Sequence, residues 1–174
     1  MSATTGPDVQ PADPTTTHLR SAEVWQRVAA RLVDHVGLAI VTAILLTPLG
    51  LGASLLGGPA GYLAGAFSAA VSAALTVGYF SVLEARDGQT IGKRLLGVRV
   101  VDAAGRPPVL ASALRRNAWT GLGVVSVVPV VGGLVGSAIT LLAAIAILVG
   151  ITRDQHGRGW HDTFAGGTRV VGGR

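Results

Sequence analysis

The sequence predicts an all-α polytopic membrane protein with four transmembrane helices and a small cytoplasmic β element. Only 13% of its 174 residues are charged, whereas a soluble globular domain has roughly 25%. Asp, Glu, Lys and Arg are also absent from two long blocks, residues 35–83 and 117–152. Because one membrane-crossing helix needs about 20 apolar residues, each block is long enough to cross a bilayer.

The chain is expected to start with a disordered cytoplasmic tail, residues 1–20, before a membrane domain over residues 21–174. The tail is rich in Thr, Pro and Ala and has no apolar periodicity, which is typical of disorder. The first apolar run begins near Leu32 and is longer than the core of a cleavable signal peptide. We therefore expect it to remain as a transmembrane segment.

The first charge-free block predicts two spans, at about residues 32–56 and 62–83. Gly57, Gly58 and Pro59 lie between them and favour a tight turn. The two spans are therefore expected to form a helical hairpin.

The second charge-free block is either one long tilted span or two short spans, at about residues 115–130 and 134–152. Pro129, Gly132 and Gly133 favour a break between two spans. A hairpin here also returns the arginines after residue 152 to the side that holds the other basic segments. We favour four spans, of which the third is either a short crossing or a re-entrant helix.

A small β element is predicted between segments that are far apart in the sequence. Residues 96–102 are rich in Val, and the β-branched run at 168–171 is their expected partner. Pairing requires both segments to lie on one side of the membrane. Residues 84–116 carry seven Lys or Arg, against three before His35, so the positive-inside rule places this side and both termini in the cytoplasm.

The first helix is expected to begin near Ser21, before its membrane-embedded part, and three ionisable residues lie near its start. Arg27, Arg31 and Asp34 are spaced by four and three residues, which places them on one helix face. Asp34 lies about one turn inside the apolar run, where a charge is costly unless it is paired or faces water. Asp34 is therefore either a functional carboxylate or the partner of Arg31 in an interfacial ion pair that reaches the headgroups.

Four other basic residues, Lys93, Arg94, Arg115 and Arg116, are expected to face anionic lipid headgroups. The segment at residues 88–94 is not a phosphate-binding loop, because its glycine spacing is one residue short and Arg94 replaces the required Ser or Thr. The formal charge of +5 comes from residues beside the apolar blocks. The lipid bilayer is therefore the expected partner, and no nucleic-acid binding is expected.

No catalytic or metal-binding constellation is recognised in the sequence. Cysteine is absent, and His161 next to Asp162 has neither a nucleophile motif nor a helical pair of ligands beside it. The expectation is a protein without enzymatic activity, cofactor or metal. Trp160 is expected to hold the loop around His161 at the headgroup level.

Taken together, four stretches resemble the RDD family of bacterial membrane proteins, which is named for one arginine and two aspartates. These stretches cover nearly everything after the tail: RVAARLVD at 27–34, GQTIGKRLLGVRVVDAAGRP at 88–107, LRRN at 114–117 and RGWHDTFAGGTRVV at 158–171. One departure is a doubled glycine, Gly166 and Gly167, where the family pattern has a single one.

The resemblance implies that the family arginine is Arg27, its first aspartate Asp34 and its second Asp162. It also implies a bacterial cell membrane location and transport of an unidentified ligand or cation/proton exchange. We expect Arg27, Arg31, Asp34 and Asp162 to form a charge cluster at the cytoplasmic face. The alternative is a non-transporting accessory or scaffold protein, with a second copy or another membrane protein as its partner.

Overall fold

The computed structural model describes residues 20–128, 132–155 and 157–172. The predicted tail, apart from Arg20, and the predicted break at Pro129 lie outside these residues. The described elements follow in chain order: α1 (Val24–Leu56), α2 (Gly58–Asp87), α3 (Ile91–Leu95), β1 (Val98–Val101), α4 (Leu110–Asn117), the 3₁₀ helix η1 (Ala118–Val127), α5 (Gly132–Arg153), α6 (Trp160–Phe164) and β2 (Arg169–Gly172).

Three of these helices, α1, α2 and α5, are long and apolar enough to cross a membrane. Each contains one of the spans predicted at 32–56, 62–83 and 134–152. Large apolar side chains stay exposed along them, including Leu55 and Leu134. Such surfaces are suited to lipid, because a helix in a bilayer does not need to bury its apolar face against protein.

The third predicted span, residues 115–130, was expected to be a short crossing or a re-entrant helix, and its described part contains two kinds of helix. It begins as α4 at Leu110 and continues as η1 from Ala118, a 3₁₀ run longer than is usual. The Asn117 side chain donates to the Ala113 carbonyl at 2.9 Å, and Thr120 Oγ1 donates to the Asn117 carbonyl at 2.7 Å. These side-chain bonds to the backbone occur where the regular α-helical geometry ends.

The predicted strand pairing is confirmed. β1 and β2 are antiparallel, with Val100 opposite Val170 in the register. The chain before α1 extends this sheet, since the Ala22 N–H donates to the Val170 carbonyl at 3.0 Å. The doubled glycine does not prevent pairing, because Gly166 and Gly167 both take positive φ, at 90° and 84°, which glycine adopts readily.

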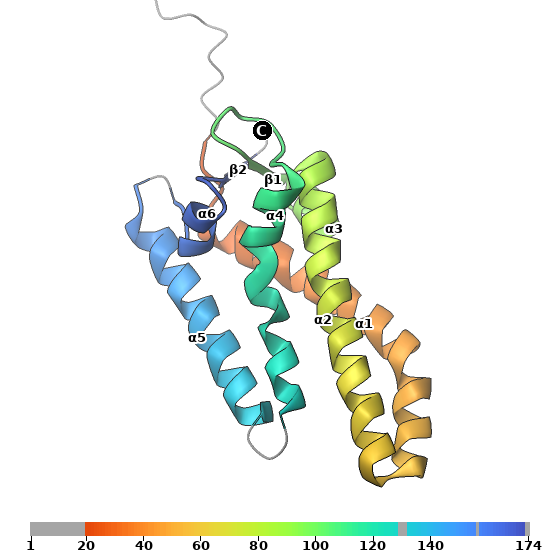
Figure 1. The fold of residues 1–174 in the computed structure, drawn as a ribbon. Coiled ribbons are helices and arrows are strands. Elements are labelled where there is room, and N and C mark those ends of the chain that lie inside the picture. Colours follow the sequence, from red (N-terminus) through yellow and green to blue (C-terminus); the bar gives the residue numbers. More distant parts are fainter. Residues whose placement is uncertain (1–19, 129–131, 156, 173–174) are drawn as a thin grey trace, which may run out of the picture.

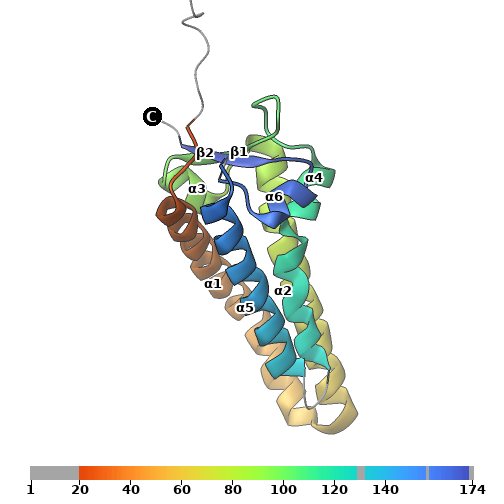
Figure 2. The same cartoon turned by 90° about the vertical axis from the view of Figure 1, so that its left-hand side faces the viewer.

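The helices are arranged as two hairpins joined at one end (Figure 1). One hairpin is α1 with α2, and the other is η1 with α5. The sheet, α3 and α6 all lie at the joined end, which we call the sheet end; the view turned by 90° shows the same grouping (Figure 2). The Gly172 N–H donates to the Arg20 carbonyl at 3.0 Å, so both ends of the described chain meet there.

The apolar core also lies at the sheet end. It is small and joins the start of α1 to the two strands through Ala22, Ala30, Val98, Val100 and Val170. Four buried charged residues that pair with one another, Glu84, Lys93, Arg116 and Asp162, also lie at this end.

Candidate functional site

A fully buried carboxylate, Glu84, lies near the end of α2 at the centre of an ion network. Its oxygens accept from Arg116 Nη1 at 2.8 and 2.9 Å and from Asn117 Nδ2 at 2.9 Å. Lys93 Nζ forms a further ion pair with it. An isolated buried charge is costly, and these three donors from α3 and α4 stabilise the Glu84 carboxylate.

A second buried carboxylate, Asp162, extends the network to α6. Arg116 Nε donates to Asp162 Oδ1 at 2.7 Å, and Thr168 Oγ1 donates to the same oxygen at 3.0 Å. The Gly159 N–H donates to the other oxygen, Oδ2, at 3.1 Å. Burial alone favours the neutral acid, but Arg116 holds the pKa of Asp162 below its ordinary value. One arginine therefore bridges Glu84 and Asp162, which lie 78 positions apart in the sequence.

Asp34 on α1 is buried but does not belong to this ion network. Its Oδ1 accepts from the Tyr79 hydroxyl at 2.7 Å and from the Gly92 N–H at 2.8 Å, and Thr90 Oγ1 donates to its Oδ2. Among the described residues no ion pair joins Asp34 to Arg31. The interfacial pair considered from the sequence is therefore wrong for this structure, and Asp34 instead binds α1 to α2 and α3.

We expect Asp34→Asn to weaken this joint by about 1–3 kcal/mol, because the amide nitrogen cannot accept the hydrogen bonds that a carboxylate oxygen accepts. The unfolding temperature in a neutral detergent measures the effect. Asp102→Asn is the matched control, since Asp102 lies in a half-exposed turn and its Oδ1 accepts only from backbone N–H groups. Equal unfolding temperatures for the two variants would show that Asp34 does not hold α1.

The two arginines of α1 lie close to the network without an ion-pair partner in the described part of the chain. Arg27 donates to the backbone carbonyls of Ala22 and Val170, each at 3.1 Å, and to that of Gly157. Arg31 Nη2 donates to Asn117 Oδ1 at 3.0 Å, and its guanidinium carbon lies 3.8 Å from the Phe80 ring centroid. The predicted cluster is thus only partly assembled, because Asp162 binds Arg116 and not an arginine of α1.

The prediction that four basic residues face lipid headgroups is wrong for two of them. Lys93 and Arg116 are 6% and 4% exposed and bind Glu84. Burial lowers the pKa of Lys93 to about 8, while Glu84 opposes this shift. Arg94 and Arg115 are exposed, so their headgroup contacts stay a prediction. The sequence signal that was missed is Glu84, the first charge after the apolar block.

His161 is buried beside Arg116, and we expect its titration to make the stability of the protein depend on pH. Burial, together with Arg116, lowers the pKa of His161 to about 3. Between this value and its ordinary pKa of about 6.5, only the unfolded state binds the proton. Stability should therefore fall by about 2 kcal/mol between pH 7 and pH 5 through this residue. The measurement is the unfolding temperature of wild type and His161→Gln at both pH values. An equal fall in both proteins would contradict the assignment.

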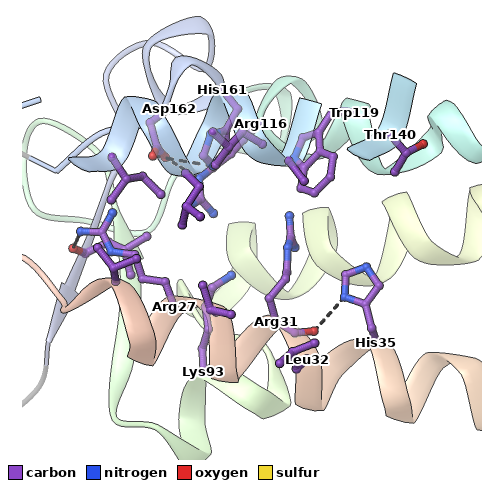
Figure 3. Close-up of a pocket in the computed structure, with 17 residues that line it drawn as sticks. Arg27, Arg31, Leu32, His35, Lys93, Arg116, Trp119, Thr140, His161 and Asp162 are labelled. Carbon is purple, nitrogen blue, oxygen red and sulfur yellow. Dashed lines mark hydrogen bonds and ion pairs between the residues drawn. The ribbon is translucent and has the colours of Figure 1, made fainter. Parts of the chain in front are cut away.

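A cavity of about 390 Å³ lies beside the network, between α1 and α5. Figure 3 shows Arg27, Arg31, Lys93, Arg116 and Asp162 around it. The rest of the wall is mostly apolar. Among the described residues, no three His, Asp or Glu side chains lie together as a metal site. The arrangement is suited to a ligand with a negative charge and an apolar part.

Long apolar helices joined at one end by a compact, charge-containing region define a membrane-type protein. A model of the RDD family matches residues 21–166. The chain therefore belongs to the RDD family, and the resemblance noted from the sequence is confirmed. Neither the curated proteins nor the solved structures give a match.

Proposed function

We propose that this protein binds an anionic ligand at the sheet end, as the recognition step of transport. The observation that carries the proposal is the charge of the cavity wall. Arg27, Arg31, Lys93 and Arg116 line the cavity together with one carboxylate, Asp162, and Glu84 behind the wall pairs with Lys93 and Arg116. Two of these cations, Arg27 and Arg31, have no ion-pair partner in the described part of the chain. A negative ligand would offset the charge of these two part-buried arginines.

The same geometry favours an anion over the cation expected for cation/proton exchange. A bound cation needs free oxygen ligands. Both oxygens of Glu84, of Asp162 and of Asp34 already accept hydrogen bonds from protein donors. An inorganic cation would therefore have to compete with these protein donors for the carboxylate oxygens.

The anion test uses dodecyl phosphate, which reports on soluble and lipid-like ligands alike. In a neutral detergent, the dissociation constant of the purified wild type for dodecyl phosphate should be about tenfold lower than that of Arg31→Met. This corresponds to about 1.4 kcal/mol of binding free energy. Arg115→Met is the control, since Arg115 is exposed and does not line the cavity. Equal binding by wild type and a folded Arg31→Met would contradict the site. Proton or sodium flux in vesicles that Asp34→Asn abolishes would instead favour cation exchange.

We further propose four membrane crossings, with both termini on the cytoplasmic side of the bacterial cell membrane. Supporting this, Arg20 and Gly172 meet at the sheet end, which requires an even number of crossings. The 8 residues of α4 and 10 residues of η1 reach roughly 30 Å together, because a 3₁₀ helix rises about 2.0 Å per residue. The apolar core of a bilayer is about 30 Å thick, so η1 would cross most of it while α4, which carries Arg115, would lie at the headgroup level.

The topology test uses single cysteines, since the chain has no cysteine of its own. Ala60→Cys and Gly133→Cys should react with an impermeant maleimide on intact cells. Ala104→Cys, in the turn after β1, should react only after permeabilisation. If Gly133→Cys behaves like Ala104→Cys, the segment α4–η1 is re-entrant and does not cross.

The second candidate is the non-transporting accessory or scaffold protein. The satisfied hydrogen bonds of Glu84 and Asp162 favour it, because they make the network a fixed joint between α2, α4 and α6. A stoichiometric complex with a second copy or another membrane protein, surviving mild detergent, together with no ligand binding, would favour this role.

A further inference from the structure

The cavity between α1 and α5 has two chemically distinct parts. One part is apolar, with Val28 and Leu32 from α1 and Ala144, Leu148 and Ile151 from α5. The other part is basic and lies against α4 and α6, where Figure 3 shows Arg116 and His161 above Arg27 and Arg31. An occupant that fits both parts is an amphiphile with a charged end.

Unsatisfied donors mark the basic part. Arg31 Nη1 and Trp119 Nε1 are buried and have no hydrogen-bond partner among the described residues. Both residues line the cavity, and the Arg31 guanidinium carbon lies 5.3 Å from the Trp119 ring centroid. A buried N–H without an acceptor is costly, and both groups act only as donors. An anionic oxygen between them would satisfy both.

The apolar part opens onto surfaces suited to lipid. Leu32 is 62% exposed, and Val28 and Leu148 are each 43% exposed. All three lie on helices long and apolar enough to cross a membrane. An occupant can therefore reach the cavity sideways from the bilayer, and its chain can remain in contact with these side chains without entering water.

Resting on the proposed function, we propose that the ligand is a membrane lipid with a net negative phosphate headgroup. Its headgroup binds between Arg31 and Trp119, next to Arg27. One acyl chain lies between α1 and α5. The volume of about 390 Å³ is in the range of small-molecule sites and accommodates a headgroup with the first part of one chain.

The test compares three probes on the purified full chain in a neutral detergent. Dimyristoyl phosphatidylglycerol carries the charge and the chains, dimyristoyl phosphatidylcholine has the same chains without net charge, and glycerol phosphate has the charge without chains. Native mass spectrometry measures stoichiometry, and the unfolding temperature measures stabilisation. We expect one phosphatidylglycerol per protein, with at least about tenfold weaker binding of the other two probes.

Two variants of α5 distinguish lipid binding in the cavity from lipid binding on the outer surface of the helices. Ala144→Phe fills the apolar part and should weaken phosphatidylglycerol binding at least about tenfold. Ala146→Phe places the same side chain at an exposed position that does not line the cavity and should bind as wild type does. Neither residue is a member of the ion network, so both variants should fold.

Each of the following outcomes would overturn one part of this proposal. Equal binding of phosphatidylglycerol and phosphatidylcholine would overturn the headgroup assignment. Equal loss in Ala144→Phe and Ala146→Phe would overturn the place of the acyl chain. If glycerol phosphate binds as tightly as phosphatidylglycerol, the ligand is a soluble anion; the lipid inference then fails while the proposed function stands. If none of the three probes binds and dodecyl phosphate also fails, both fail.

Discussion

Glu84→Gln is expected to lower stability by about 3–5 kcal/mol, the largest effect of any single charge change in this chain. The variant keeps the shape of the side chain but removes its negative charge. Lys93 would then be a buried cation without an ion-pair partner among the described residues, and Arg116 would keep Asp162 as its carboxylate partner. The unfolding temperature of the purified protein should fall by roughly 10 °C.

Two further variants distinguish charge imbalance from a general surface effect. Asp87→Asn, one turn later on α2, removes a part-exposed carboxylate that pairs with Arg86 and Arg94. Asp87→Asn should lower the free energy of unfolding by less than about 1 kcal/mol, because exposed ion pairs contribute little to stability. Adding Lys93→Met to Glu84→Gln should recover part of the lost stability. A Glu84→Gln protein as stable as Asp87→Asn would disprove the central role of this carboxylate.

Gly92→Ala is expected to lower the free energy of unfolding by about 3 kcal/mol, because it forces α3 away from α1. A Cβ at this position would lie 2.2 Å from the Ala30 carbonyl oxygen and 3.0 Å from the Asp34 side chain. Backbone atoms cannot rotate aside as a flexible side chain can, so the two helices must separate. The separation also weakens the bond from the Gly92 N–H to Asp34. A lowered unfolding temperature, with faster trypsin cleavage after Arg94, measures this loss.

Gly37→Ala is the control for this close approach. Gly37 lies on α1 one turn after Asp34, and a Cβ there has no atom within 4 Å. Alanine should be neutral or stabilise the helix by up to about 1 kcal/mol. If both glycine variants behave alike, the contact between α3 and α1 does not contribute to stability.

The ion network and the cavity lie next to each other but differ in how their charges are satisfied. The carboxylates of the network are satisfied by protein donors, with Arg116 shared between Glu84 and Asp162. In the cavity, Arg31 keeps an unsatisfied N–H. The rigid network holds the incompletely satisfied donors beside it in a fixed position. A ligand that binds them therefore loses less free energy to the ordering of these side chains.

Several features of the fold followed from local patterns in the sequence. Charge-free blocks predicted the long helices α1, α2 and α5, because such length and composition are not tolerated in water. The Val-rich run ending at Val101 and the β-branched run at 168–171 predicted the strand pair, since β-branched residues favour extended backbone. The family followed from four short motifs whose order and spacing can be compared directly.

The partners of the charges were decided only by the tertiary structure. Lys93 and Arg116 stand in polar segments beside apolar blocks, where the sequence gives no reason to separate them from exposed Arg94 and Arg115. Their burial depends on Glu84, 9 residues from Lys93 and 32 from Arg116. Local periodicity determines which face of a helix a residue occupies, whereas a contact between distant segments depends on how the helices pack. The sequence alone thus determined the membrane-type helices and the family, and packing at the sheet end determined which charges meet.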